Sequence, residues 1–332
     1  MRVMVTGGGG FLGTAICGQL LGAGHEVLSY QRSAADHLQA LGAYPVRGDL
    51  GNLEQLCRDT RGCDAVIHTA GKAGIWGEYS DYYQANVLGT ENVIKACREN
   101  NIPHLVYTSS PSVVHGGGDI EGGDESLPYP RRFHSPYPAT KALAEPLVMA
   151  ANGDQLKTVA IRPHLIWGPG DPHILPRLMA KAAGGKLALP GTDKLIDTIF
   201  VENAAHAHLL ALEGIRQSGP CCGKTYFISN DEPLPQKEII SKLLDAAGMN
   251  PVIKPVPALL AKTAGLVCQA LWKALPLSSE PPVTRWSADQ LSTAHWYDIS
   301  AAKRELGYQP KFSIDEGLEL LGRHFETAGH TA

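Results

Sequence analysis

R-V-M-V-T-G-G-G-G-F-L-G, residues 2–13, sets the architecture of the whole chain. Arg2–Thr6 is short and largely apolar and predicts a buried strand, which runs directly into four consecutive glycines. Ile16 and Leu20 continue at helical spacing, and His25–Tyr30 has the composition of a second strand. Strand, glycine turn, helix and strand within about thirty residues form the context in which a glycine pattern predicts a dinucleotide-binding unit.

The glycines of this turn have separate expected roles. Gly7 permits the tight turn, Gly10 lets the backbone approach a pyrophosphate, and Gly13 lets helix and strand pack closely. We expect Phe11 and Leu12, in the first helical turn, to lie against the same group, because free N–H groups at a helix N-terminus bind phosphates. The alternative is a glycine turn that is purely structural.

The end of the second strand indicates which dinucleotide is bound. An NAD-binding unit usually places a carboxylate there for the ribose 2′-hydroxyl. Tyr30-Gln31-Arg32-Ser33 contains no carboxylate and one guanidinium. Arg32 is able to pair with a 2′-phosphate and to stack on adenine, so the sequence favours NADP(H). A solvated surface arginine is the alternative interpretation.

Further strands are predicted at Tyr44–Val46, Asp64–Gly71 and Leu105–Thr108. In a doubly wound sheet of the Rossmann type the carboxyl ends of the strands form the ligand crevice. His68 is interpreted as a packed strand-end histidine rather than a catalyst. The predicted cofactor contacts on these strand ends are Asp49, Leu50, Thr69, Ala70, Gly71 and Lys72.

Two polar groups follow in the chain. Asn86 opens a predicted helix and is either its cap or part of the site. Ser109–Ser112 continue from the fifth strand and place hydroxyls where the substrate should lie. His115–Ser135 is rich in Gly, Pro and acidic residues and is interpreted as a mobile loop or lid.

Tyr137 and Lys141, in Y-P-A-T-K, are four residues apart and share one helix face. Tyrosine ordinarily has a pKa of about 10, and a neighbouring ammonium lowers it, so the pair is a candidate general acid/base. Alone, the motif also occurs by chance on protein surfaces. Pro146 lies inside the same helix and predicts a kink beyond the pair.

The second half of the chain looks like a smaller lobe. Thr158–Pro163 predicts a sixth strand, from which His164-Leu165 turn away beside the expected nicotinamide. Lys224–Ser229 predicts a late strand of the main sheet. We therefore predict an α/β fold with a dinucleotide-binding Rossmann domain at residues 1–165 plus about 196–230. A mixed substrate lobe should comprise about 166–195 plus 231–330.

Composition excludes several kinds of protein. A net charge of −4 gives no basic field for nucleic acid, and 44% hydrophobic with 19% charged residues is ordinary for a globular enzyme. The seven cysteines include no C-x-x-C pair, so we expect cytoplasmic thiols and no metal site. No secretory signal is expected, since the first residues run straight into a strand.

A helix over Ala258–Leu275 carries one apolar stripe, including Leu260, Val267 and Leu271. We interpret it as a core helix or a wall of the substrate cavity. The alternative is a helix that lies on a membrane surface, because the uncharged run is too short to span a bilayer.

Four motifs together resemble one family. They are T-G-G-G-G-F-L-G at 6–13, Y-T-S-S at 107–110, Y-P-A-T-K at 137–141 and R-P-H-L-I-W-G-P-G-D at 162–171. This set is similar to the extended short-chain dehydrogenases/reductases, in their 3β-hydroxysteroid dehydrogenase-like branch, and the resemblance continues through Asp298–Tyr308. Y-T-S-S-P-S-V-V-H at 107–115 and P-P-V-T-R-W at 281–286 are most similar to the NADPH-dependent 2-alkyl-3-oxoalkanoate reductases of bacterial long-chain olefin biosynthesis.

The resemblance implies roles for individual residues. Tyr137 would donate the proton to the developing alkoxide, and Lys141 would lower its pKa and hold the nicotinamide ribose. Ser110 would hydrogen-bond the substrate carbonyl, with Ser109 as the adjacent alternative. Asn86 matches an asparagine that lines the cofactor site. The backbone beside the nicotinamide is matched by Pro163, His164 and Leu165.

The expected activity is NADPH-dependent reduction of a long-chain 2-alkyl-3-keto acid to the 3-hydroxy acid. The carboxylate should meet one of five cations that the sequence does not rank: Lys72, Arg131, Arg132, Arg177 or Arg285. The alternatives are a 3β-hydroxysteroid or sterol-carboxylate dehydrogenase, a nucleotide-sugar epimerase and a non-catalytic NADP-binding redox sensor. The resemblance leaves open a homodimer and an association with other olefin-pathway enzymes or with the inner-membrane surface.

Overall fold

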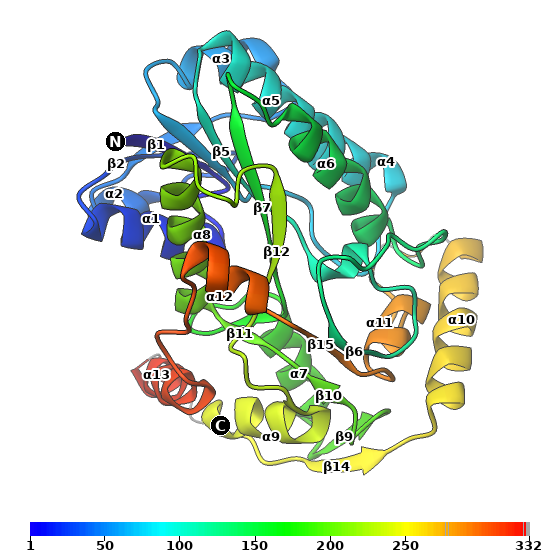
Figure 1. The fold of residues 1–332 in the computed structure, drawn as a ribbon. Helices are drawn as coiled ribbons and strands as arrows, with labels where there is room; N and C mark the ends of the chain where they lie inside the picture. The colour runs from blue at the N-terminus through cyan, green and yellow to red at the C-terminus, as the bar shows by residue number, and fades with distance from the viewer. Residues whose placement is uncertain (276, 278, 328, 330–332) are drawn as a thin grey trace.

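A parallel sheet in the strand order β12-β7-β5-β4-β1-β2-β3 forms the centre of the computed structural model, which describes residues 1–275, 277, 279–327 and 329 (Figure 1). The order reverses at β1, which lies between β4 and β2, so the predicted doubly wound Rossmann sheet is confirmed. Its strands are β1 (Arg2–Thr6), β2 (Glu26–Gln31), β3 (Tyr44–Arg47), β4 (Ala65–His68), β5 (His104–Thr108), β7 (Lys157–Pro163) and β12 (Lys224–Ile228).

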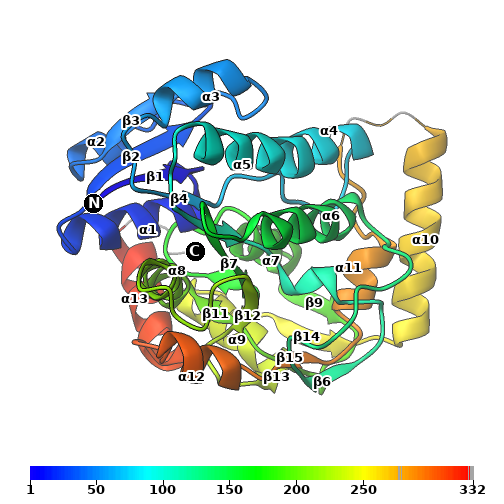
Figure 2. The same ribbon diagram turned by 45° about the horizontal axis from the view of Figure 1, so that its top comes forward.

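Helices cover both faces of this sheet (Figures 1 and 2). One face carries α1 (Phe11–Gly22) and α8 (Val201–Arg216), and the other carries α3 (Leu53–Asp59), α5 (Gly89–Glu99) and α6 (Pro136–Ala151). α1 presents Leu12, Ile16 and Leu20 to the sheet, at the spacing that buries one helix face. Shorter helices α2 (Asp36–Ala40) and α4 (Tyr79–Tyr83) lie on the connections.

α6 is continuous through Pro146, so the proline does not end the helix. The predicted kink stays a prediction. Tyr137 and Lys141 lie N-terminal to the turn in which Pro146 removes a backbone donor, and both are within the same regular helix.

Smaller sheets lie beyond the carboxyl ends of the main strands (Figure 1). One has the order β13-β10-β15-β6, and two pairs are β11-β8 and β14-β9. Their strands are β6 (Ile120–Gly123), β8 (Ile166–Trp167), β9 (Lys186–Leu189), β10 (Leu195–Ile196), β11 (Ile199–Phe200), β13 (Leu234–Pro235), β14 (Val252–Pro255) and β15 (His295–Tyr297). The helices are α7 (Ile174–Ala182), α9 (Gln236–Ala246), α10 (Ala258–Ala274), α11 (Arg285–Gln290), α12 (Ser300–Leu306) and α13 (Ile314–Thr327).

These elements follow the expected mixed lobe, and β12 returns to the edge of the main sheet as predicted. The domain boundaries themselves stay a prediction, and residues 328 and 330 at the predicted end lie outside the described part. His115–Ser135 was expected to be a mobile loop, but it contains β6, which pairs with β15 in parallel. That partner is remote in sequence, so the local Gly- and Pro-rich composition did not indicate a strand.

α10 is not the core or cavity-wall helix that its apolar stripe predicted. Gly265 is its buried residue, while Leu259 is 78% exposed and Leu260 62% exposed. α10 stands at the edge of the molecule beside α11 (Figures 1 and 2). The stripe shows one apolar face, but periodicity alone does not reveal whether another element covers that face. Over the described residues, every helix falls short of the length and apolarity that crossing a membrane requires.

Candidate active site and cofactor cleft

A cavity of about 1470 Å³ opens at the carboxyl ends of the main strands. It runs from the glycine turn past the first residues of α6 and into the region of α7, α9 and α11. All predicted cofactor and catalytic residues line it except Asn86 and Lys141. Those that line it are Gly7, Gly10, Phe11, Leu12, Gly13, Arg32, Asp49, Leu50, Thr69, Ala70, Gly71, Lys72, Ser110, Tyr137, Pro163, His164 and Leu165.

The glycine turn has the shape that phosphate binding needs. Gly7 has φ +71° and its N–H donates to the Tyr30 carbonyl at 2.7 Å, so a side chain there would be strained. A Cβ on Gly13 would lie 2.1 Å from the Gly7 carbonyl oxygen, so the helix approaches the turn closely. Gly10 is the N-cap of α1 and lies in the cleft. The first turn of α1 therefore offers backbone N–H groups to an anion.

Beyond the glycine turn, the end of the cleft is formed by the residues that follow β2 and β3. Arg32 lines it, is exposed, and accepts a hydrogen bond on its carbonyl from Arg47 Nε at 3.0 Å. Asp49 Oδ1 accepts from the Gly51 N–H at 2.7 Å. Both residues line the cavity, and their contacts with the adenosine end of a cofactor stay a prediction.

Asn86 is neither the helix cap nor the cleft-lining residue that we expected. It lies in a π-helical turn, η1 (Gln84–Leu88), and is 1% exposed. Its Oδ1 accepts from the Lys72 N–H at 2.7 Å, and its Nδ2 donates to the Lys72 carbonyl at 3.1 Å and to Thr140 Oγ1 at 2.9 Å. Asn86 therefore fixes the backbone at Lys72 and connects it to α6. A π turn leaves no simple periodicity that sequence reasoning could read.

His68 is the packed strand-end histidine that the sequence indicated. It is fully buried at the end of β4, where Nδ1 contacts Thr6 Oγ1 at 2.7 Å and Nε2 contacts Thr90 Oγ1 at 3.0 Å. Burial lowers the pKa of His68 to about 3, so the ring is neutral.

Ser110 and Tyr137 come together in the middle of the cleft. The 3₁₀ turn η2 (Pro111–Val113) follows β5, and Ser110 is its N-cap, accepting from the Ser112 N–H at 3.2 Å. Ser110 Oγ lies 2.8 Å from Ser112 Oγ, and the Ser110 hydroxyl is near enough to Tyr137 to lower the pKa of that phenol. The adjacent Ser109 is only 3% exposed. The geometry thus places Ser110 beside the candidate acid.

Lys141 lies one turn further along α6 and is 5% exposed. Its Nζ donates to the Thr108 carbonyl at 2.5 Å and lies 4.3 Å from the centre of the Tyr107 ring. Burial lowers the pKa of Lys141 to about 7, and the charge of Glu145 opposes that shift. In this structure the amine is therefore held by a strand-end carbonyl at the floor of the site.

The expected effect of Lys141 on Tyr137 needs correction. Burial raises the pKa of Tyr137, and the group that opposes this rise is the Ser110 hydroxyl rather than the lysine. The four-residue spacing correctly put both side chains on one helix face, but it carried no information on how deeply each is buried. A tyrosine with a raised pKa keeps its proton at neutral pH, as a proton donor must.

A buried ion pair that the sequence analysis missed lies behind this site. Arg162 on β7 donates to Glu145 through Nε at 2.9 Å and Nη2 at 2.5 Å, and Tyr129 Oη donates to the same carboxylate at 2.5 Å. Burial favours a higher pKa for Glu145, but the bonds from Arg162 outweigh it and hold the pKa below its usual value. The signal was present, since Tyr137, Lys141 and Glu145 repeat at four-residue spacing on one face.

His164 belongs to a second buried network that the sequence did not reveal. Its Nδ1 pairs with Asp197 Oδ1, and its Nε2 lies 3.2 Å from His295 Nδ1. His295 Nε2 lies 2.8 Å from the Gln290 carbonyl, which only accepts, so that nitrogen carries the proton. Burial lowers the pKa of His295 to about 3, so its Nδ1 accepts from His164. The network joins the end of β7 to β15 and α11.

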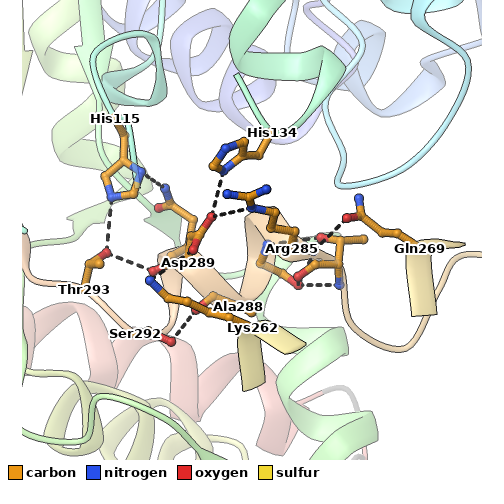
Figure 3. A network of polar contacts seen from close by, with 12 residues as sticks. His115, His134, Lys262, Gln269, Arg285, Ala288, Asp289, Ser292 and Thr293 are labelled. Carbon is orange, nitrogen blue, oxygen red and sulfur yellow. Dashed lines mark hydrogen bonds and ion pairs between the residues drawn. The ribbon is translucent and has the colours of Figure 1, made fainter. Parts of the chain in front are cut away.

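The far half of the cleft is largely apolar. It is lined by Ile166, Trp167, Ile174, Leu178, Ile196, Ile239, Ile240, Leu243 and Leu291. α11 closes one side and is anchored by a buried carboxylate, Asp289, which pairs with His134 Nδ1 at 2.8 Å and Lys262 Nζ at 3.1 Å (Figure 3). Arg285 Nε lies 3.9 Å from the same group. Asp289 thus connects α10, α11 and the loop before α6.

Within the described residues, groups of three or more His, Cys, Asp or Glu side chains placed to hold a metal ion are absent. The chemistry that the cleft itself supports is proton transfer by Tyr137 and Ser110 at its centre. On one side lies an anion-binding glycine turn, and on the other lies apolar space for a substrate.

The chain is similar to known proteins over nearly its whole length. The chain is 49% identical to a 2-alkyl-3-oxoalkanoate reductase of Stenotrophomonas maltophilia, over 97% of this chain and 98% of the relative. It is 48% identical to a protein of the same name from Shewanella oneidensis, over 96% of this chain and 85% of the relative.

A solved structure and a family model agree with this placement. The crystal structure of Thermus thermophilus UDP-glucose 4-epimerase in complex with NAD superposes with a TM-score of 0.75 at 26% identity. The match covers 99% of this chain and 100% of that one. The sequence model of the 3-beta hydroxysteroid dehydrogenase/isomerase family matches residues 4–255. With its glycine turn, its Ser110–Tyr137 pair and these matches, the chain belongs to the 3-beta hydroxysteroid dehydrogenase/isomerase family.

Proposed function

We propose that the protein is an NADPH-dependent reductase that converts a long-chain 2-alkyl-3-oxoalkanoate to the 2-alkyl-3-hydroxyalkanoate, in olefin hydrocarbon biosynthesis. The observation that carries the proposal is the Ser110–Tyr137 pair, which lies between the glycine turn and the apolar half of the cleft. Two relatives that are almost half identical and carry the name of this reductase support the choice of substrate class.

The cofactor half of the cleft fits a dinucleotide. Gly7 and Gly13 leave no room for a Cβ, and Gly10 presents the N-terminus of α1, so the turn would hold the pyrophosphate. Arg32 at the end of β2, with no carboxylate on that strand end, favours the 2′-phosphate of NADP(H). When bound, NADPH supplies the hydride that reduces the keto group.

The residues of this chain supply the proton and the orientation. Ser110 donates a hydrogen bond to the substrate keto oxygen and aligns it with the Tyr137 hydroxyl. Tyr137 gives its proton to that oxygen as negative charge develops there, so a phenol that remains protonated at neutral pH is suited to reduction. The Ser110 hydroxyl is the neighbour that lowers the pKa of Tyr137 against the effect of burial, and the Thr108 carbonyl orients the Lys141 amine one turn away.

The substrate half of the cleft suits two alkyl arms. Its apolar side chains come from β8, α7 and α9, and they outnumber the cations of this region, Arg177 and Lys181. This favours a lipid-like keto acid over the nucleotide sugars of the epimerases. A steroid alcohol is the second candidate, because the family is described by 3-beta hydroxysteroid dehydrogenases and an apolar surface would suit a steroid.

The proposed setting is the cytoplasm, and all seven cysteines are free thiols, as a reducing compartment maintains. The exposed apolar face of α10, with Leu259, Leu260 and Val267, favours contact with an apolar surface, either the inner membrane or another enzyme of the pathway. A homodimer is a further proposal.

One assay tests the activity. Purified protein is given NADPH or NADH with a 2-alkyl-3-oxoalkanoate, a 3-oxosteroid or a nucleotide sugar, and cofactor oxidation is followed. We expect turnover with the keto acid and a strong preference for NADPH. Turnover confined to steroids would favour the second candidate. Absence of turnover with all three substrate classes, with NADPH still bound, would favour a redox sensor.

A further inference from the structure

We propose that Arg177 on α7 forms the carboxylate-binding subsite of the substrate, and that Glu280 holds this guanidinium until the substrate carboxylate replaces it. The inference rests on the proposed function, because it assumes a substrate that carries a carboxylate beside its keto group. It assigns to one residue a role that the sequence left divided among five cations.

Three of the five candidate cations are excluded as carboxylate ligands because they do not line the cleft. Arg131 and Arg132 are exposed and do not line the cavity. Arg285 also lies outside the lining and faces the Asp289 carboxylate (Figure 3). Lys72 and Arg177 remain as cations of this set that line the cleft.

Lys72 is the weaker candidate of the remaining two. The N–H and the carbonyl of Lys72 are both hydrogen-bonded to the Asn86 side chain, and its Nζ pairs with Asp81 at 2.7 Å. The same Nζ lies 5.0 Å from the centre of the Tyr82 ring. The amine is therefore already oriented toward α4, on the cofactor side of the cleft, and it lacks the two-pronged shape that matches a carboxylate.

Three histidines of the cleft, His115, His164 and His295, do not supply a free cation either. Burial lowers the pKa of His115 to about 4 and of His295 to about 3, so both rings are neutral at physiological pH. His115 is also bonded on both nitrogens, to Gln290 Nε2 at 2.9 Å and to Thr293 Oγ1 at 3.2 Å (Figure 3). His164 uses one nitrogen for Asp197 and the other for His295.

Arg177 is placed where the substrate acid should lie. Ile174, Arg177, Leu178 and Lys181 repeat at helical spacing and form the face of α7 that lines the cleft. Arg177 is thus a guanidinium flanked by two apolar side chains. This combination is what a carboxylate with adjoining alkyl arms requires. Lys181 has a compact charge one turn further along, and its pKa is lowered by burial and by Arg177.

The structure already shows a carboxylate on this guanidinium. Arg177 Nη2 donates to the two oxygens of Glu280 at 2.9 and 3.2 Å. Glu280 lies between α10 and α11, so the pair links the face of α7 to that connection. The two side chains are 41% and 48% exposed, and ion pairs with this exposure are weak. A substrate carboxylate held in place by buried alkyl arms is therefore able to displace Glu280.

The test compares an acid with its ester, using the stable product in the oxidative direction. A 2-alkyl-3-hydroxyalkanoate or its methyl ester is oxidised with NADP⁺, and NADPH formation gives kcat and KM. The variants are Arg177→Met, Arg177→Lys and Glu280→Gln. The matched control is Arg323→Met, which removes an exposed arginine paired with Glu319 on α13.

We expect Arg177→Met to raise KM for the acid by about 10- to 100-fold, as loss of a charge-assisted hydrogen bond does. The KM for the ester should change little, and kcat should change little with both substrates. Arg177→Lys should lie between wild type and Arg177→Met. Glu280→Gln should lower KM for the acid several-fold, because it removes the competing carboxylate, and should leave the ester unaffected.

Two results would overturn the inference while leaving the proposed function in place. One is an equal change for acid and ester in Arg177→Met, and the other is a higher KM for the acid in Glu280→Gln. Failure of the wild-type protein to oxidise either compound would instead contradict the proposed function.

Discussion

Tyr137 has a hydroxyl whose pKa the structure raises, with the Ser110 hydroxyl beside it and an amine one turn further along α6. The phenol therefore arrives protonated, as a proton donor must, and the Ser110 hydroxyl limits the loss of acidity that burial causes. Sequence spacing predicted the Tyr137–Lys141 pair, and the family resemblance indicated the serine beside it. The depth of burial, which sets the pKa values of Tyr137 and Lys141, depends on β5 and β7 and was not visible in the five-residue motif Y-P-A-T-K.

Replacing Tyr137 with Phe removes the proton donor and little else. We expect turnover to fall by at least about 100-fold, the usual contribution of a positioned acid. The unfolding midpoint and NADPH binding should stay close to wild type. Tyr79→Phe, at a half-exposed tyrosine on α4, is the control and should leave kcat unchanged. Unchanged turnover in Tyr137→Phe would point to another donor.

Lys141 should make stability depend on pH. Its folded pKa of about 7 lies below its ordinary 10.5, so between these values the unfolded chain binds a proton that the folded protein does not. Unfolding free energy should therefore rise with pH in that window, and this gain should be lost as the pH falls toward 7. The comparison is between wild type and Lys141→Met by urea unfolding from pH 7 to 9.

The difference between these two proteins should grow in favour of wild type by about 1 kcal/mol per pH unit. Other titrating groups contribute equally to both and cancel in the comparison. Parallel stability curves would show that Lys141 keeps an ordinary pKa in the folded protein.

At the scale of elements, α10 shows what periodicity does and does not predict. The helix exists where the apolar stripe placed it, yet its stripe faces outward and its contact with α11 occurs at a glycine. A Cβ on Gly265 would lie 2.7 Å from the Thr284 carbonyl oxygen and 2.9 Å from the Arg285 nitrogen. The small residue, rather than the leucines, is therefore what allows the two helices to approach.

Gly265→Ala should separate steric effects from helix propensity. Alanine favours a helix by about 1 kcal/mol over glycine, but the clash with the α11 backbone should outweigh this and destabilise the protein by about 1–2 kcal/mol. Because Trp286 and Gln290 of α11 line the cleft, KM for the substrate should also rise.

Gly18→Ala is the matched control for that substitution. Gly18 lies within α1, and a Cβ there would meet nothing within 4 Å. This variant should be more stable than wild type by about 0.5–1 kcal/mol, with KM unchanged. Stabilisation by both alanines would mean that α10 and α11 are free to move apart.

Other elements also differ in whether their local sequence pattern was enough to predict them. Strands of the main sheet were predictable because each is a short apolar run bounded by turn residues, as at Ala65–His68. β6 was not, because its four residues include two glycines and its partner lies at β15. The π turn at Asn86 and the two-residue strands β8 and β10 leave too little pattern to be recognised.

At the scale of the whole molecule, the dinucleotide half could be predicted almost completely and the substrate half hardly at all. The glycine turn and strand ends follow local rules, so Gly7, Arg32 and Thr69 were placed in the cleft from sequence. His164, Asp197 and His295 meet only after three distant segments fold together. No spacing in a single chain encodes such a contact.

This network should also hold the two halves together. Asp197 is 1% exposed, pairs with His164 and accepts from the Tyr297 N–H at 3.0 Å. Asp197→Asn weakens the buried hydrogen bonds to His164 and to the Tyr297 N–H, so we expect a loss of about 1–3 kcal/mol in urea unfolding. Asp193→Asn, at an exposed site on the connection before β10, should be neutral. A loss below about 0.5 kcal/mol in Asp197→Asn would show that the pair does not stabilise the fold.

The pairing of β6 with β15 has a consequence for biosynthesis. During translation, the segment that contains β6 emerges from the ribosome long before the segment that contains β15. β6 therefore stays unpaired until synthesis of the chain is nearly complete. The glycine turn and its neighbouring strands are close together in the sequence, so they can pair early in synthesis. We therefore expect nascent chains released before β15 to acquire dinucleotide affinity while the entrance beside Tyr137 is still unformed.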